Sequence, residues 1–417
     1  MGGFRRHGIF HSLLLSRKKR IPHCSYHIYV IAGESSGDKL GYHLVHSLQT
    51  MDSRLVVSGV GGPLLKERGL DSLFPWEELS VMGWSSVLWR IPRLFYRLKQ
   101  VERDIRVKQP DAIIAIDSKG FSSRIFQRIA RNEKGWSPLR IQYVGPSVWA
   151  IKDGWKAAQQ FGKWVDHLLL LFPLEAVLWK QANVPCTVVG PSFCENLAWL
   201  DKVKYPRNHS TTRLVALLGS RIQEVKRSAP LVMKCIQLLR NQGIHNLQVV
   251  IPYVGHTLSW IENWFHHEDS DIEWVNGEDE KSYFEALCTS DLAVAVSGTA
   301  VMECHICQLA VIVIYPCDGL TSYMIKRKVT VPYASMANIM LDHSIIPELL
   351  FEQCKVENLL PLIKKGLIET EWRTQQLLAL QPWIHSFREL VHCQGKPSER
   401  AAKTILSLLS KKRHDEA

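Results

Sequence analysis

Two stretches of the sequence place a carboxylate directly after a short apolar run. Glu34 follows the run at residues 28–32, and Asp117 follows the run at residues 112–116. A carboxylate that leaves a strand end into a cleft can take a proton from an attacking alcohol. Sugar hydroxyls fit the first loop better than a pyrophosphate, because Glu34 and Asp38 repel phosphate and the dinucleotide pattern GxGxxG is absent. An N-capping turn made by Ser36 or Asp38 explains the first loop equally well, and a capping or solvent-facing aspartate explains Asp117 equally well.

A third stretch, in the second half of the chain, suits a diphosphate. Gly219, Ser220 and Arg221 form a turn after an apolar run, and Glu224 stands three residues beyond the arginine. Backbone N–H groups at such a turn bind anions, and an arginine can hold a phosphate through two parallel hydrogen bonds. Glu224 either caps the following helix or orients Arg221.

A fourth stretch has the chemistry of a nucleotide site. Ser297, Gly298, Thr299 and Ala300 open a predicted helix after another apolar run, and Glu303 lies one turn into that helix. A helix N-terminus attracts phosphate, and a carboxylate one turn along can accept hydrogen bonds from ribose hydroxyls. Together with the Gly-Ser-Arg turn, this stretch indicates that the second half of the chain binds a nucleotide diphosphate.

The elements that must position these residues alternate along the chain. Helices are expected at residues 39–49, 122–131 and 174–181. Apolar strands separated by helices are typical of parallel sheets covered on both faces. A polar segment at residues 202–212 interrupts the alternation, so the sequence predicts an α/β protein of two Rossmann-like domains facing a central cleft. The expected strands are residues 28–32, 56–60, 112–116, 141–144, 167–171, 187–189, 214–218, 247–251, 272–275, 292–296 and 311–314.

The N-terminus has a composition of its own. Residues 1–33 contain no acidic residue, and residues 1–25 carry six Lys and Arg around a short apolar patch. An Arg-rich, acid-free, amphipathic start is typical of an organelle presequence. Its removal lowers the formal net charge from +11 to +5. We expect a transit peptide at residues 1–25, domains at 26–207 and 208–385, and a helical segment at 386–417.

A second concentration of basic residues lies at residues 84–108. Aromatic and basic side chains alternate there, which suits a lipid headgroup interface and suits RNA equally. An amphipathic helix with a solvated basic face explains the pattern too. The alternating residues include Trp84, Trp89, Arg90, Arg93, Phe95, Tyr96 and Arg97.

Neither a membrane span nor a metal site is predicted. No run approaches 18 consecutive apolar residues, which is the length that a transmembrane helix needs. The ten cysteines are scattered, and Cys304 and Cys307 have no second pair at the spacing of a zinc site. We expect these two cysteines to be buried, reduced thiols.

Several motifs follow one another along the chain in a fixed order, and together they are far more specific than any one of them. They comprise residues 32–38, 81–83, 110–111, 116–117, 146–150, 171–175, 219–221, 224, 297–300, 303, 338 and 347–350. The set resembles the lipid-A-disaccharide synthase family over roughly residues 28–400. Members of that family are glycosyltransferases that join UDP-2,3-diacylglucosamine to 2,3-diacylglucosamine 1-phosphate, giving a β-1,6-linked disaccharide and UDP. The resemblance implies a glycosyltransferase-B fold, inverting transfer without a metal or cofactor, and peripheral membrane attachment.

The resemblance also implies roles, position by position. Asp117 is the expected catalytic base, with Glu34 as a second carboxylate beside it. The expected UDP-sugar site comprises Gly219, Ser220, Arg221, Glu224, Ser297, Gly298, Thr299, Ala300, Glu303 and Asn338. The expected acceptor and membrane residues are Ser35, Met82, Trp84, Trp89, Arg90, Arg93 and Arg97.

The resemblance names the partners and a location. The partners are the two acylated sugars and an anionic membrane surface, without nucleic acid, and a homodimer is left open. From the Arg-rich start we expect an organellar eukaryotic member of the family, on the matrix side of the mitochondrial inner membrane. Another organelle, or the cytoplasmic face of a bacterial inner membrane, remains the alternative.

Three positions depart from the family's pattern. Residues 118–120 replace a usual Pro-Asp before the phenylalanine, Pro191 replaces the histidine expected after Gly190, and residues 336–337 replace a Leu-Pro before Asn338. These changes keep open a protein that binds UDP-sugar or acyl lipid and has lost transferase activity. A UDP-sugar epimerase on the same fold would turn over without an acceptor. Nucleic-acid binding rests on the charge alone.

Overall fold

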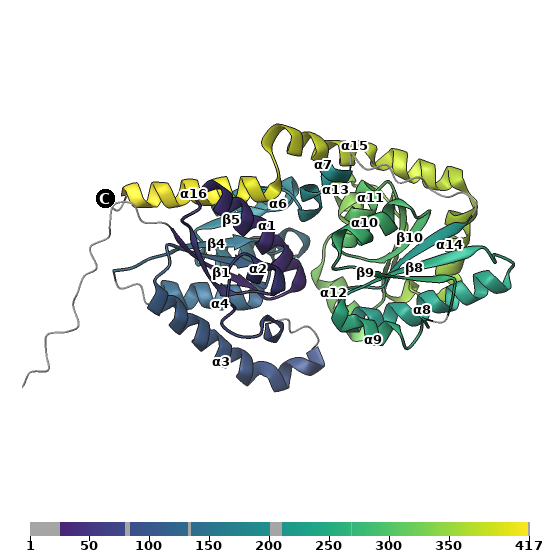
Figure 1. The fold of residues 1–417 in the computed structure, drawn as a ribbon, viewed down its shortest axis with the longest axis horizontal. Helices are drawn as coiled ribbons and strands as arrows, with labels where there is room; N and C mark the ends of the chain where they lie inside the picture. The colour runs from purple at the N-terminus through teal and green to yellow at the C-terminus, as the bar shows by residue number, and fades with distance from the viewer. Residues whose placement is uncertain (1–25, 80–83, 132–134, 201–210, 268, 416–417) are drawn as a thin grey trace, which may run out of the picture.

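The computed structural model describes residues 26–79, 84–131, 135–200, 211–267 and 269–415, apart from the side chains of residues 84–91 and 198–199. Two α/β domains lie side by side (Figure 1). The predicted transit peptide, residues 1–25, lies outside the described residues. The elements of the first domain are β1 (His27–Ala32), α1 (Ser35–Met51), β2 (Val56–Val60), α2 (Pro63–Glu67), α3 (Trp84–Lys108), β3 (Ala112–Ile116), α4 (Lys119–Ala130), β4 (Leu139–Tyr143), α5 (Gly154–Gly162), β5 (His167–Leu170), α6 (Pro173–Gln181) and β6 (Cys186–Val188). The short helix α7 (Leu197–Leu200) follows them in the chain and packs into the core of the second domain.

Six parallel strands form the first sheet, in the order β2-β1-β3-β4-β5-β6. Helices cover both faces of the sheet, so there is a hydrophobic core on each face. In β1, Val30 packs into the core on one face and Ile31 into the core on the opposite face. The chain order reverses between β1 and β3. Such a switch point opens a crevice at the carboxyl ends of the strands. Glu34 and Asp117 directly follow these two strands.

The second sheet repeats this plan in the order β12-β11-β10-β7-β8-β9, again with parallel strands. Its chain order reverses between β7 and β10. The turn that ends in Arg221 follows β7, and Ser297 follows β10. The elements are β7 (Thr212–Leu217), α8 (Ile222–Asn241), β8 (Leu247–Tyr253), α9 (Leu258–Ile261), β9 (Ile272–Asn276), α10 (Glu280–Cys288), β10 (Leu292–Val296), α11 (Thr299–Ile306), β11 (Ala310–Tyr315), α12 (Gly319–Lys328), α13 (Met336–Leu341), β12 (Glu348–Leu350), α14 (Val356–Ile368), α15 (Thr370–Gln394) and α16 (Pro397–Asp415).

The last helix, α16, returns to the first domain and packs along α1 (Figure 1). Ala402 and Ile405 of α16 are fully buried in the core behind β1. Ser398 donates to Glu195 through its N–H at 2.6 Å and through its hydroxyl at 3.0 Å, and it accepts a hydrogen bond from Ser47 at 3.0 Å. The chain therefore crosses between the domains twice.

The structure confirms the α/β class and the two Rossmann-like domains. Every expected strand is present, and its ends differ from the prediction by one or two residues at most. The short strand β12 was not predicted, and the linker at 202–212 lies mostly outside the described residues. Residue 386 falls within α15, and the helix that returns begins at Pro397. Among the described residues, no helix combines the length and apolar character of a membrane span.

Candidate active site between the domains

The loops after β1 and β3 lie directly against each other. A Cβ at Gly33 would stand 2.7 Å from Leu79 Cβ and 2.7 Å from Ser118 Oγ, so the close approach of these loops requires glycine. Glu34 follows Gly33, and Asp117 precedes Ser118. The two carboxylates that the sequence singled out therefore share one edge of the first sheet.

The backbone around Asp117 is strained. Asp117 and Ser118 have φ angles of 56° and 37°, and Val144, after the neighbouring strand β4, has 68°. Residues other than glycine rarely adopt this left-handed backbone conformation. Where they do, they are often found at functional sites. The N–H of Asp117 donates to the carbonyl of Tyr143 at 3.0 Å, and the amide of Gln142 donates to the carbonyl of Asp117 at 2.8 Å. These bonds hold the turn that aims Asp117 off the strand.

The environment of Asp117 favours its protonated form. Burial raises the pKa of its carboxyl, and the negative charge of Glu34 raises that pKa further. Lys119 and Arg221 act in the opposite direction. A general base works best when its pKa is close to the working pH, and shifts of this kind are concentrated at catalytic sites.

The turn before α8 is closed by Glu224. Gly219 has a φ of 108°, and a Cβ there would lie 2.5 Å from Glu224 Cβ, so glycine is required. Oε2 of Glu224 accepts the N–H groups of Ser220 at 3.1 Å and of Arg221 at 3.3 Å. Oε1 of Glu224 accepts from Arg221 Nη1 at 3.2 Å. Glu224 thus caps the helix and orients the arginine at the same time.

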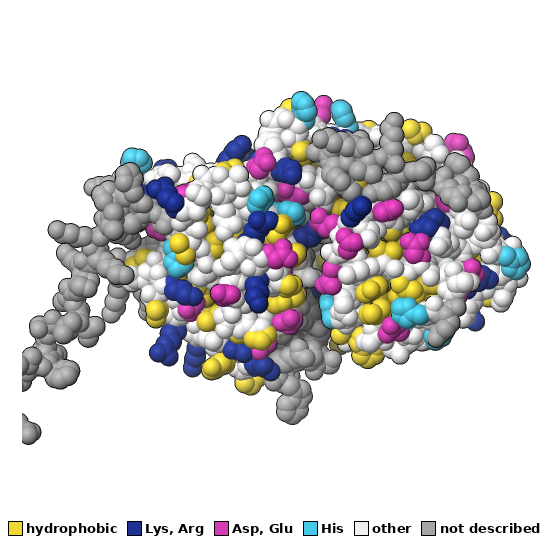
Figure 2. All heavy atoms as spheres, viewed as in Figure 1, with side chains coloured by type: hydrophobic (Ala, Val, Ile, Leu, Met, Phe, Trp, Pro, Cys, Tyr) yellow, Lys and Arg dark blue, Asp and Glu magenta, His cyan; other side chains and the backbone are white. Residues whose placement is uncertain are grey.

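Arg221 also reaches across to the first domain. Its Nη2 lies 2.9 Å from Oε2 of Glu34. A second ion pair, Lys39 Nζ to Glu280 Oε1 at 2.6 Å, joins the domains at α1 and α10. Figure 2 shows acidic and basic side chains gathered along the boundary between the domains. The expected diphosphate ligand, Arg221, is therefore brought to the carboxylate edge of the first domain.

The start of α11 offers free surface beside side chains that already have partners. The hydroxyl of Ser297 donates to the carbonyl of Ala334 at 3.1 Å, and Glu303 accepts from the hydroxyl of Tyr283 at 2.7 Å. The residues that open the helix are Gly298 and Thr299, both exposed, with Ala300 half-buried behind them.

Asn338 is fully occupied inside the second domain. Its Nδ2 donates to the carbonyl of Ile346 at 2.9 Å and to Glu348 Oε1 at 2.8 Å. Its Oδ1 accepts the N–H groups of Ile345 and Ile346, each at 3.0 Å. An amide side chain has two donors and two acceptor sites, so this buried group has none left for a ligand. Asn338 holds the loop that contains Ala334, the partner of Ser297.

Two of the predicted membrane residues on α3, Arg93 and Arg97, are paired with a carboxylate of their own domain. Arg93 and Arg97 each place two nitrogens on the carboxylate of Glu78, at 2.7–2.8 Å. Hydrogen bonds from Arg97 and Arg93 lower the pKa of Glu78 to about 2. Arg97 is 16% exposed and lies over the ring of Phe74 at 4.5 Å. It is therefore part of the domain's own packing, which the sequence pattern did not reveal.

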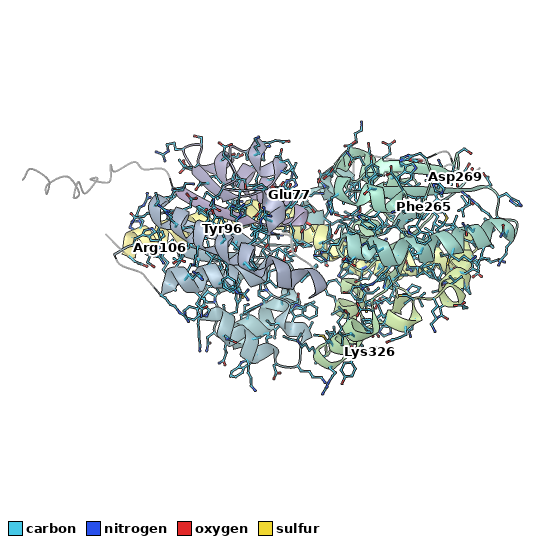
Figure 3. The ribbon with its side chains drawn as sticks, turned by 90° about the horizontal axis from the view of Figure 1, so that it is seen from below. Glu77, Tyr96, Arg106, Phe265, Asp269 and Lys326 are labelled. Carbon is cyan, nitrogen blue, oxygen red and sulfur yellow. The ribbon has the colours of Figure 1, made fainter. Side chains whose placement is uncertain are left out.

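The outward surface of α3 carries other residues. Phe95 and Tyr96 are 48% and 62% exposed, and Lys99 and Arg103 are exposed beside them. Figure 3, seen from below, shows Tyr96 and Arg106 along this helix. Ser35 is exposed at the start of α1. The remaining expected residues are Met82, which lies outside the described residues, and Trp84, Trp89 and Arg90, whose positions fall in α3 and whose side chains lie outside the description.

Two tertiary contacts escaped the sequence analysis. Gln142 stood out only as a polar residue in an apolar strand, and that is the signal that could have found it. Arg400 gave no such signal: its Nη2 lies 2.4 Å from where a Cβ of Gly190 would stand. Arg400 comes from α16, so the C-terminal helix covers the loop in which Pro191 replaces the expected histidine. Contacts between such distant segments cannot be inferred from spacing.

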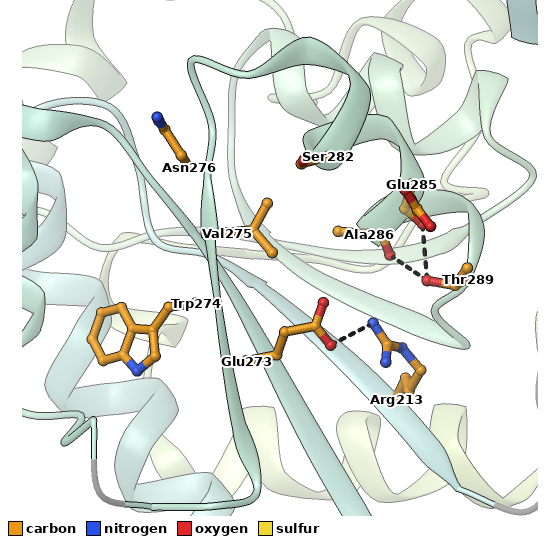
Figure 4. A pocket seen from close by; sticks show the side chains of 9 residues that line it. All are labelled: Arg213, Glu273, Trp274, Val275, Asn276, Ser282, Glu285, Ala286 and Thr289. Carbon is orange, nitrogen blue, oxygen red and sulfur yellow. Dashed lines mark hydrogen bonds and ion pairs between the residues drawn. The ribbon is translucent and has the colours of Figure 1, made fainter.

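A separate pocket lies between β9 and α10 (Figure 4). Its volume is about 470 Å³, and Arg213 and Glu273 form an ion pair at 2.9 Å on its wall. None of the expected site residues lines it. The lining residues are Arg213, Glu273, Trp274, Val275, Asn276, Ser282, Glu285, Ala286 and Thr289.

Two Rossmann-like domains meet where the loop after β1 contacts the turn before α8. This arrangement defines a glycosyltransferase-B fold. A solved UDP-GlcNAc 2-epimerase from Methanocaldococcus jannaschii, in complex with UDP-GlcNAc and UDP, has this architecture. Its TM-score is 0.58 at 10% sequence identity, over 91% of this chain and 99% of that one. At that identity the likeness establishes the fold alone.

The family follows from sequence comparison. The family model described as lipid-A-disaccharide synthetase matches residues 28–395. A lipid-A-disaccharide synthase of Rhodospirillum centenum is 33% identical over 395 residues, covering 92% of this chain and 95% of that protein. A probable mitochondrial lipid-A-disaccharide synthase of Arabidopsis thaliana is 31% identical over 432 residues, covering 91% and 90%. The chain belongs to the lipid-A-disaccharide synthase family, and it is a glycosyltransferase of lipid A disaccharide synthesis, as its motifs predicted.

Proposed function

We propose that the protein transfers a 2,3-diacylglucosaminyl group from UDP to the 6-hydroxyl of 2,3-diacylglucosamine 1-phosphate. The hydroxyl oxygen attacks the anomeric carbon, the bond to UDP breaks, and a β-1,6-linked disaccharide 1-phosphate forms with inversion. The observation that carries this proposal is the meeting of Asp117, Glu34 and Arg221 at one point between the domains.

In this proposal Asp117 takes the proton of the attacking hydroxyl. The left-handed turn directs the carboxylate away from β3, and burial together with Glu34 raises its pKa toward the range of a useful base. Ser35, exposed beside Glu34, contributes to the acceptor side. Asp117 and Ser35 both stand outside the three positions that depart from the family's pattern, although Ser118, the first of them, shares the left-handed turn of Asp117.

On the donor side, Arg221 neutralises the charge that develops on the departing diphosphate. Gly219, Ser220 and Glu224 set the turn that presents the arginine. The exposed N-terminus of α11 suits the other end of the nucleotide. That site comprises Ser297, Gly298, Thr299 and Ala300, with Glu303 one turn behind. Asn338 acts here as a positioning residue through the loop of residues 334–348.

The test is a transfer assay with both acylated sugars. Wild type should form disaccharide and UDP, and Asp117→Asn should lower kcat by roughly 10²–10⁴-fold. Equal rates for the two proteins would remove Asp117 from the role of base. A measurable UDP Kd without transfer, over a range of acyl lengths, would instead identify a binding protein.

We also propose that the outward face of α3 meets an anionic bilayer, where acylated substrates reside. Exposed Phe95 and Tyr96 beside Lys99 and Arg103 fit the headgroup region. Lys99→Glu/Arg103→Glu should reduce binding to vesicles containing anionic lipid, most strongly at low salt. Lys403→Glu/Lys411→Glu on α16 makes the same change of charge elsewhere and should not. Equal loss from both pairs would leave only a general charge effect.

A mitochondrial location on the matrix side is the last part of the proposal. Its support is the Arg-rich, acid-free composition of residues 1–25 and the name of the Arabidopsis relative. A fluorescent fusion of residues 1–40 should enter mitochondria. The same fusion with its Arg and Lys replaced by Gln is the control. Delivery of the native fusion to another compartment would contradict the proposal.

A further inference from the structure

Arg221 is shared between two carboxylates from different domains. Nη1 bonds to Glu224 at 3.2 Å, and Nη2 bonds to Glu34 at 2.9 Å. Glu224 belongs to the same turn and also closes the amides of that turn. Glu34 belongs to the first domain, and its side chain is only 17% exposed. The outer nitrogens of the guanidinium, which would hold a diphosphate, are therefore already engaged.

A diphosphate at Arg221 competes with the carboxylate of Glu34. Two-point binding of a phosphate uses two nitrogens of the guanidinium, and Nη2 is already bonded to Glu34, so the two anions compete for it. Two like charges at hydrogen-bond distance from one cation also repel each other. Glu224 is held by backbone N–H groups of its own turn, whereas Glu34 lies at the start of α1 with Arg221 as its side-chain partner. Glu34 is the partner that can leave.

We propose that Glu34 occupies Arg221 until the donor's diphosphate displaces it, so that donor binding releases a carboxylate next to Asp117. This inference rests on the proposed function, since it takes the donor to bind at Arg221. The released charge then faces Asp117 without Arg221 to neutralise it, and a nearby negative charge makes a carboxylate a stronger base. Asp117 therefore becomes a stronger base only when the donor is bound. As a result, the acceptor hydroxyl is not activated before the donor is in place.

The domains do not depend on this ion pair to stay together. Lys39 and Glu280 bridge them at 2.6 Å, and the chain passes from α15 on the second domain to α16, which packs on α1 of the first. Glu280→Gln therefore removes a second interdomain ion pair without touching Arg221, which makes it the control for loosening of the cleft. Any general loosening of the cleft should appear in that variant too.

The experiment is titration calorimetry of UDP into the full-length protein, which needs no turnover. Glu34→Gln should bind UDP roughly three- to tenfold more tightly than wild type, because the partly buried ion pair between Glu34 and Arg221 no longer competes with the diphosphate. Glu34→Asp shortens the side chain out of reach of Arg221, and it should also bind UDP more tightly. This second variant serves if the first does not fold. Glu280→Gln should bind UDP as wild type does.

Unchanged or weaker UDP binding by the Glu34 variants would overturn the displacement, while leaving UDP as the donor nucleotide. Equal tightening in Glu280→Gln would overturn it as well, because cleft opening would then suffice. Failure of the wild type to bind UDP at all would overturn the donor site itself, and with it the proposed function. The two failures are thus distinguishable.

Discussion

The side-chain amide of Gln142 donates to the backbone carbonyl of Asp117 at 2.8 Å, from within the neighbouring strand. The same nitrogen also lies 3.2 Å from the carbonyls of Tyr143 and Val144. Gln142 is fully buried, so these bonds act without competition from water. One polar side chain in an apolar strand therefore holds together the left-handed turns that follow β3 and β4.

Gln142→Leu should reduce catalysis more than it reduces donor binding. The substitution keeps the size of the side chain and removes its bonds to three carbonyls, so the turn at Asp117 loses its support. We expect kcat to fall roughly ten- to a hundredfold, because small displacements of a base are costly. Unfolding free energy should fall by about 1–3 kcal/mol. UDP affinity, measured by calorimetry, should stay within twofold.

The matched control for Gln142 is its neighbour. The hydroxyl of Tyr143 is buried without a hydrogen-bond partner among the described residues, so Tyr143→Phe should leave kcat unchanged. A loss of kcat in this variant, or an unchanged kcat in Gln142→Leu, would remove Gln142 from the role of positioning residue.

The pH dependence of transfer should report the pKa of Asp117. A base must be deprotonated, and burial and Glu34 both raise this pKa, so kcat should begin to fall on acidification at a higher pH than an ordinary Asp, near 3.9, would give. Glu34→Gln removes one cause of the shift, so the acid limb should move to lower pH whatever the change in kcat. A limb that stays in place would show that Glu34 does not act on Asp117.

The same shift has a consequence for stability. A carboxyl whose pKa is raised in the folded state binds its proton more readily there than in the unfolded chain. The unfolding free energy therefore falls as pH rises from the unfolded pKa of this carboxyl through its folded pKa. At neutral pH the ionised carboxylate lowers the stability of the folded protein. Asp117→Asn should raise Tm slightly at pH 7 while it abolishes most transfer.

Sequence patterns predicted the architecture well because strand and helix periodicity follow from local burial. The same is true of the chemistry at strand ends: Glu34, Asp117 and Arg221 stand where parallel strands of a two-domain protein must place them. Pairings between distant segments were beyond reach. No spacing relates Arg93 and Arg97 to Glu78, or Arg400 to Gly190, since tertiary packing brings these groups together.

The sequence placed Asn338 in the UDP-sugar site, but the structure shows it bonded within its own domain. As a ligand of the donor, Asn338→Ala should weaken UDP binding in a stable protein. The structure favours the other result, because the substitution leaves the N–H groups of Ile345 and Ile346 without their acceptor. We expect a loss of about 2–4 kcal/mol in urea unfolding. Asn358→Ala, an exposed amide with one bond, should cost less than about 0.5 kcal/mol.

The glycine-rich turn after β2 should prove structural. Asp38 accepts the N–H groups of Gly62, Leu64 and Leu65 at 2.8–3.2 Å, so it caps α2 and binds no sugar through those oxygens. Gly59, in β2, has a φ of 140°, and a Cβ there would stand 1.9 Å from the carbonyl oxygen of Val30. That atom is backbone in the middle of the sheet and cannot give way.

Gly59→Ala should therefore destabilise the protein by at least about 2–3 kcal/mol, through a clash added to backbone strain. Gly69→Ala separates the two causes: Gly69 has a φ of 84° with nothing within 4 Å, so only strain remains, roughly 1 kcal/mol. Urea unfolding of both variants measures the difference. Equal losses would mean that strand β2 shifts to accept the methyl group. In that case the first sheet could adjust near the loop that contains Glu34, even though Gly33 in that loop is closely packed against Leu79 and Ser118.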